Sequence, residues 1–90
     1  MTYEKILMLL RDEDTCKVLR EIKKSKTGYL TGWRLLKLFD TMPHEEIEAI
    51  LRDLLCAELV GKEGPESSNL DDAYYLTPKG LEYVGLIKIG

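Results

Sequence analysis

Hydrophobic residues recur every three to four positions in several segments, and this spacing predicts a mainly helical chain. The clearest run covers residues 43–59, where Ile47, Ile50, Leu51, Leu54 and Leu55 fall at helical spacing without a miss. Residues at this spacing share one helix face, which must be buried against the rest of the protein. Shorter runs of the same kind predict helices at residues 2–11, 15–26 and 32–39.

Polar residues, glycine and proline mark where these helices begin and end. Asp12, Glu13 and Asp14 interrupt the first run and supply N-cap candidates for the second helix, which Gly28 would end. Thr31 is a plausible N-cap for the third helix, and Pro43 suits the first turn of the fourth. The connections between the predicted helices are therefore short.

The pattern changes after Leu59. Residues 59–63 and 73–77 are rich in strand-forming side chains, and the polar stretch 64–72 separates them, which predicts a hairpin with a long tip. Thr77 followed by Pro78 then favours a closing helix. The fold class is thus mainly α with a small β-hairpin (α+β). We expect a single domain over residues 1–90, since a chain of 90 residues supports one small core. Its parts are an N-terminal helix (1–11), a three-helix core (15–59), the hairpin (59–77) and a C-terminal helix (78–88).

This order of elements resembles the winged helix-turn-helix domain of small prokaryotic transcription regulators of the MarR, ArsR and PadR type. In those domains a leucine-rich helix ends in a short step into the wing, and the second wing strand ends in a tyrosine, Leu-Thr and a Pro-Lys-Gly turn. The residues at matching places are Leu51, Leu54, Leu55, Glu58, Leu59, Val60, Tyr75, Leu76, Thr77, Pro78 and Gly80. The resemblance supports the fold more than the activity, because each of these residues also has a packing role.

The resemblance implies a DNA-binding regulator in which helix 43–59 lies in the major groove and loop 64–72 reaches the DNA backbone or the minor groove. The expected DNA contacts are Thr31, Arg34, Lys37, His44, Glu45, Glu48, Arg52, Lys62, Ser67, Ser68 and Asn69. Lys23, Lys24 and Lys26 are secondary phosphate contacts, although cations at a helix C-terminus also favour the helix dipole. We expect double-stranded DNA as the partner and a homodimer as the binding unit, because two half-sites raise affinity and specificity.

The expected dimer surface combines the N-terminal helix with the apolar end of the chain. Its residues are Tyr3, Ile6, Leu7, Leu10, Val84, Leu86 and Ile87. Packing within one core is the alternative for these side chains. The lone Trp33 has three candidate roles, which are closing the core, lining a partner surface and stacking on a ligand, and packing is the commonest of these.

The charge distribution departs from that of a typical DNA-binding protein. Residues 1–40 carry nine Lys or Arg against six Asp or Glu, whereas residues 41–90 carry four against ten. The predicted DNA-facing helix therefore presents carboxylates, including Glu45, Glu46 and Glu48, and carboxylates facing phosphates lower affinity. The alternative function is a winged-helix interaction module whose acidic helix face docks a basic protein.

Few other classes of protein fit the sequence. Cys16 and Cys56 form no CxxC pair and His44 is the only histidine, so we expect buried thiols and neither a metal nor a cofactor. No nucleophile–base pair or phosphate-binding glycine loop is present, so we do not expect an enzyme. No apolar run is long enough to span a membrane, and charge appears too early for a signal peptide, which favours the cytoplasm. Asn69 is the only Asn and Gln is absent, which is typical of thermophilic or archaeal proteins.

Overall fold

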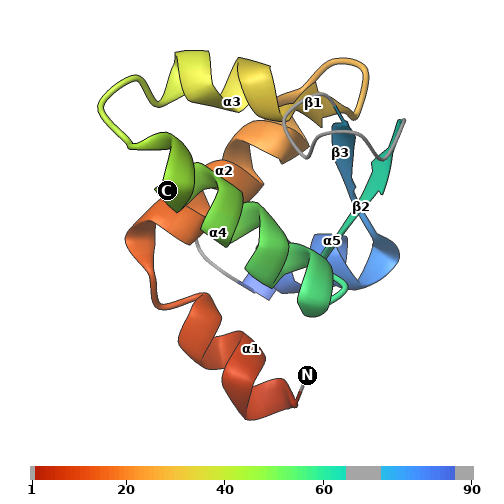
Figure 1. Cartoon of the computed structure of the whole chain (residues 1–90). Helices are drawn as coiled ribbons and strands as arrows, with labels where there is room; N and C mark the ends of the chain where they lie inside the picture. Colours follow the sequence, from red (N-terminus) through yellow and green to blue (C-terminus); the bar gives the residue numbers. More distant parts are fainter. Residues whose placement is uncertain (1, 65–71, 87–90) are drawn as a thin grey trace.

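The structure, a computed structural model, describes residues 2–64 and 72–86. Within these ranges the chain forms five helices and three strands (Figure 1). In chain order they are α1 (Tyr3–Leu9), α2 (Glu13–Lys24), β1 (Leu30–Thr31), α3 (Gly32–Leu38), α4 (His44–Cys56), β2 (Val60–Glu63), β3 (Ala73–Leu76) and α5 (Pro78–Leu86). The predicted class, mainly α with a small hairpin, is confirmed.

Helices α2, α3 and α4 supply most of the core. The α4 stripe of Ile47, Ile50, Leu51 and Leu54 is buried, as its spacing predicts. It packs with Val18, Leu19 and Ile22 of α2, Leu35 of α3, and Leu59, Val60 and Tyr74 near the wing. Leu55, predicted with the stripe, is partly buried against the same core. Figure 1 shows α4 crossing in front of α2, with the sheet to one side of both helices.

N-cap side chains fix where α2 and α3 begin. Asp12 is the N-cap of α2, and its carboxylate accepts hydrogen bonds from the Thr15 N–H at 3.0 Å and the Thr15 hydroxyl at 2.8 Å. Thr31 is the N-cap of α3 and accepts from the Arg34 N–H at 3.1 Å. Helix α2 therefore begins two residues before the predicted start. It also ends at Lys24, so Gly28 (φ +83°) lies in the turn beyond the helix.

The sheet contains one strand more than the predicted hairpin. Strand β3 lies between β1 and β2 and is antiparallel to both. Leu30 and Thr31 pair with Tyr74 and Ala73, so β1 connects the wing to the start of α3. This two-residue strand is too short to give an alternating pattern in the sequence. In the hairpin, Gly61 lies opposite Tyr75, whose ring occupies the space that a side chain at Gly61 would need.

Hydrogen bonds at the turn between α4 and β2 connect the end of α4 to the start of α5. Glu58 adopts a left-handed conformation (φ 61°), while the Glu58 and Leu59 N–H groups bond the carbonyls of Leu55 and Leu54. This is the Schellman pattern, which usually places glycine at the left-handed position. The Thr77 hydroxyl donates to the Glu58 carbonyl at 2.6 Å and accepts from the Gly80 N–H at 3.0 Å. The end of α4 is thus bonded to the start of α5.

Helix α1 lies beside α5 at one end of the molecule (Figure 1), and the Tyr3 and Tyr83 ring centroids are 6.0 Å apart. Ile6 and Val84, expected at a dimer surface with core packing as the alternative, are 1% and 5% exposed and pack in the core of this chain. Tyr3 and Leu7 are exposed and Leu10 is half-buried. Leu86 is the last residue of α5, and Ile87 lies outside the described residues.

Candidate nucleic-acid interface

The outward face of α4 is acidic along most of its length. His44, Glu45, Glu46, Arg52 and Asp53 are exposed, so Arg52 is the one cation among them. Glu48, predicted to face DNA, is instead half-buried, and its charge acts on the hydroxyl of buried Tyr74. The predicted contacts His44, Glu45 and Arg52 are therefore available to a partner, whereas Glu48 is turned toward the body of the protein.

Carboxylates also gather where the N-termini of α2 and α4 meet. A side-chain hydrogen bond with Asp14 raises the pKa of Glu46, and burial together with the charges of Asp14 and Asp12 adds to this shift. Acidic residues in a first helical turn favour the helix dipole, which accounts for Asp14 and Glu46 individually. Their proximity adds negative charge beside the start of α4, and this would oppose a phosphate at the same place.

Trp33 lies on the surface of α3 and not in the core. Its side chain is 49% exposed, and its ring centroid is 6.3 Å from that of His44 with the ring planes at 85°. Of the roles that the sequence leaves open for this tryptophan, full burial in the core does not apply, whereas packing at the rim of the core, a partner surface and ligand stacking remain compatible with its position. The edge-to-face contact between Trp33 and His44 joins the first turns of α3 and α4, which are the two helices of the helix-turn-helix.

The base of the wing is held by an ion pair. Lys62 of β2 places its Nζ 3.1 Å from Oδ2 of Asp72, and the Asp72 side chain is 1% exposed. The sequence predicts Lys62 as a DNA contact. In the structure the Lys62 ammonium instead neutralises the buried Asp72 carboxylate, so its charge is already engaged at the base of the wing. Burial, followed by the charges of Asp72 and Glu48, raises the pKa of the neighbouring Tyr74 to about 12.

Five of the predicted DNA and phosphate contacts are cations on α2, on the turn after it and on α3. Lys23 and Lys24 are in the last turn of α2, Lys26 is in the following turn, and Arg34 and Lys37 are on α3. All five are exposed. The predicted contact Thr31 is half-buried and caps α3. Ser67, Ser68 and Asn69, predicted at the wing tip, lie outside the described residues.

The two cysteines differ in their surroundings. Cys16 is half-buried and its thiol donates to the Leu10 carbonyl at 2.9 Å, while burial, with the charge of Asp12, raises the pKa of that thiol. Cys56 is exposed, so the expectation of a buried thiol is wrong for it. Residues 2–64 and 72–86 contain no group of three or more His, Cys, Asp or Glu side chains placed to hold a metal ion. None of the helices in these ranges is long and apolar enough to span a membrane.

Comparison with known proteins supports the fold. No family model matches the sequence, and no curated protein matches it. Among solved structures, MarR from Staphylococcus aureus in complex with salicylate and kanamycin is similar, with a TM-score of 0.73 and 21% sequence identity. The match covers 92% of this chain and 54% of that one, so this chain spans about half the length of the MarR chain. The chain therefore has the winged helix-turn-helix fold, and the predicted resemblance to MarR-type regulators is confirmed at the level of the fold.

Proposed function

We propose that the protein is a transcription regulator that binds double-stranded DNA through its winged helix-turn-helix. The observation that carries this proposal is the arrangement of α3, α4 and the β2–β3 wing, which aligns with a MarR structure at a TM-score of 0.73. In this fold the second helix of the helix-turn-helix enters the major groove and the preceding helix supports it. Here those two helices are α4 and α3. A regulator of this kind would act in the cytoplasm, where its DNA is.

Most of the affinity would come from the cations of α2 and α3. Lys23, Lys24, Lys26, Arg34 and Lys37 are exposed and can approach phosphates, whereas Lys62 is occupied by Asp72. On α4, Arg52 can reach a phosphate or a guanine, and Glu45 can accept a hydrogen bond from a cytosine amino group. We therefore expect weak binding to DNA of arbitrary sequence, because the carboxylates of α4 repel phosphates. Binding should be tighter at a site whose bases offer hydrogen-bond donors to these carboxylates.

A homodimer would compensate for this weak interface. Tyr3, Leu7 and Met8 of α1 and Leu81 of α5 are exposed, with Met8 at 66% and Leu81 at 51%. Exposed apolar side chains on neighbouring helices are typical of protein contact surfaces. Burial of this α1–α5 surface between two copies would present two α4 helices to successive half-sites.

The test is fluorescence anisotropy of the purified protein with generic and self-promoter duplexes across a salt series, with the mass from light scattering on the same sample. We expect binding that weakens steeply with salt, a dimer mass, and a weaker affinity for Lys23→Ala, Lys24→Ala and Arg34→Ala. Lys17→Ala is the matched control, because Lys17 is an exposed cation of α2 outside the basic cluster. Absence of binding near about 50 mM salt, where phosphate contacts are strong, contradicts the proposal.

The acidic face of α4 supports a second candidate function, a module that docks a basic protein. Glu45, Glu46 and Asp53 are exposed there with a single Arg52 among them. Complementary charge would steer a cationic surface to this face. If DNA does not bind, Glu45→Gln combined with Asp53→Asn should weaken capture of a basic partner, while Lys23→Ala should not.

A further inference from the structure

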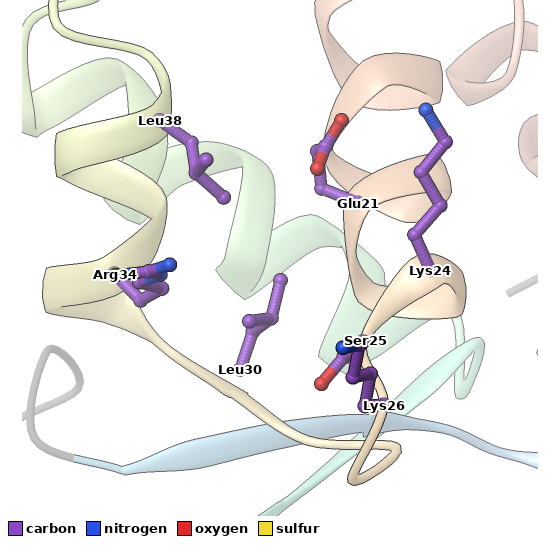
Figure 2. A pocket seen from close by; sticks show the side chains of 7 residues that line it. All are labelled: Glu21, Lys24, Ser25, Lys26, Leu30, Arg34 and Leu38. Atoms are coloured by element: carbon purple, nitrogen blue, oxygen red, sulfur yellow. The ribbon is translucent and has the colours of Figure 1, made fainter.

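A pocket of about 300 Å³ lies between α2 and α3, away from the outward face of α4. Its walls are formed by Glu21, Lys24, Ser25 and Lys26 on one side and Arg34 and Leu38 on the other, with Leu30 of β1 at the base. Figure 2 shows Leu30 rising between the two helices. This volume is at the lower end of the range for small-molecule sites, so it suits a compact ligand.

Two opposite charges face each other across this pocket. In Figure 2 the Glu21 carboxylate points from α2 toward α3, and the Arg34 guanidinium points from α3 toward α2. In the part of the chain that the structure describes, these two groups do not form an ion pair with each other or with another side chain. Each is therefore available to a charged group placed between them. A guanidinium favours a carboxylate, with which it forms two parallel hydrogen bonds, and a carboxylate favours an ammonium.

The rest of the lining restricts the ligand further. Leu30 and Leu38 supply an apolar surface between the two charges, and the Leu38 side chain points into the same space (Figure 2). Lys24 and Lys26 line the same side as Glu21, and together with Arg34 they make the charge of the lining positive overall, which favours a ligand that carries a negative group. A ligand that uses every part of this lining carries a carboxylate, an ammonium and an aliphatic body.

We propose that this pocket binds a small zwitterion with an aliphatic body, namely a free amino acid with an apolar side chain. Arg34 holds the carboxylate, Glu21 holds the ammonium, and Leu30 and Leu38 contact the side chain. The bound molecule would join α2 to α3, and α3 supports α4. The inference goes beyond DNA binding and does not depend on it, because the site is formed within one chain and its test contains no DNA.

The experiment is a titration of ¹⁵N-labelled protein, followed by amide chemical shifts, with three compounds at constant ionic strength. L-leucine carries both charges, isocaproate lacks the ammonium, and isoamylamine lacks the carboxylate. We expect L-leucine to give saturable shifts at the amides of Leu30, Arg34 and Leu38, and each analogue to bind about tenfold more weakly. Arg34→Gln should weaken L-leucine about tenfold, and Glu21→Gln should abolish the preference for L-leucine over isocaproate.

The control variant is Lys17→Gln, which removes an exposed charge of α2 outside the pocket and should leave L-leucine binding unchanged. Melting curves of all three variants establish that they fold. The proposal is overturned if L-leucine gives no saturable shift, or if isocaproate binds as tightly as L-leucine to the unaltered protein. The second result would identify a simple anion site. Shifts spread over the surface and unchanged in Arg34→Gln would also overturn it.

Discussion

Gly80 lies directly against the backbone carbonyl of Leu59, and a Cβ atom at position 80 would overlap the Leu59 oxygen. The same oxygen accepts a hydrogen bond from the Thr77 N–H at 3.2 Å, so it is fixed in place. Glycine at the start of α5 thus reflects a close approach of two backbones. Gly85, in the same helix, has open space around its Cα.

Substitution of these two glycines should have opposite effects. Gly80→Ala forces α5 away from Leu59, and we expect it to lower the free energy of unfolding by about 2 to 3 kcal/mol. Gly85→Ala should raise it by about 0.5 kcal/mol, because alanine favours helix and meets no neighbour. Urea denaturation followed by circular dichroism measures both. Equal effects of the two substitutions would contradict this account of the α5 start.

Replacement of Glu58 by glycine should raise the stability of the protein. Its φ of 61° is costly for a residue with a Cβ, and we expect Glu58→Gly to stabilise the protein by about 1 kcal/mol. The carbonyl that accepts from Thr77 is retained in the variant. Glu58→Ala is the control, since it removes the carboxylate and keeps the Cβ. A gain of the same size in Glu58→Ala would show that charge, and not backbone strain, limits stability here.

Stability should fall at high pH because of Tyr74. Burial raises the pKa of Tyr74 to about 12 from an ordinary value near 10.0, so the native state retains its proton while the unfolded chain releases it. The contribution is fully present below pH 10 and is lost as the pH rises through about 12. It amounts to roughly 2 to 3 kcal/mol.

Urea midpoints between pH 9 and pH 12 would measure this effect. Tyr74→Phe, which cannot ionise, should lose less stability over that interval than the unaltered protein. Absorbance of the phenolate should also show that the tyrosine with the highest pKa is missing in the variant. An identical pH dependence in both proteins would contradict the role of Tyr74.

The ion pair at the base of the wing should matter for stability more than an exposed lysine does. Lys62→Met leaves the Asp72 carboxylate buried without its partner, and we expect a loss of about 1 to 3 kcal/mol, moderated because the Lys62 side chain is 31% exposed. Asp72→Asn in the same protein should recover part of this loss. Lys37→Met is the control, because Lys37 is exposed on α3. Thermal melts that shift equally for Lys62→Met and Lys37→Met would refute the claim.

Local patterns in the sequence predicted the helices well. The α4 stripe follows from side-chain period alone, and the caps at Asp12 and Thr31 follow from residue types next to the helix starts. Strand β1 escaped prediction because it exists through pairing with Tyr74 and Ala73, which are more than forty positions away. The pattern of neighbouring residues does not indicate a contact between such distant positions.

The candidate site was harder to predict for the same reason. Lys62 and Asp72 are both charged and lie beside the wing tip, and no local pattern indicates that Asp72 is buried and paired with Lys62. The sequence also left the role of Trp33 open, and only the packing of α3, which buries Leu35, shows that Trp33 lies at the surface beside His44. The pocket between α2 and α3, with Glu21 and Arg34 on opposite walls, depends on how the two helices pack, and the spacing of residues along the chain does not indicate that packing.

The two hydrogen bonds of the Thr77 hydroxyl limit how the chain can be shortened. One joins it to the carbonyl of Glu58 at the end of α4, and the other to the N–H of Gly80 in the first turn of α5. A fragment that stops after the hairpin would lose the Gly80 partner and would expose the Leu59 carbonyl that α5 covers. The smallest fragment that keeps the C-terminal end of α4 fully hydrogen-bonded therefore includes α5, although both wing strands separate α5 from α4 along the chain.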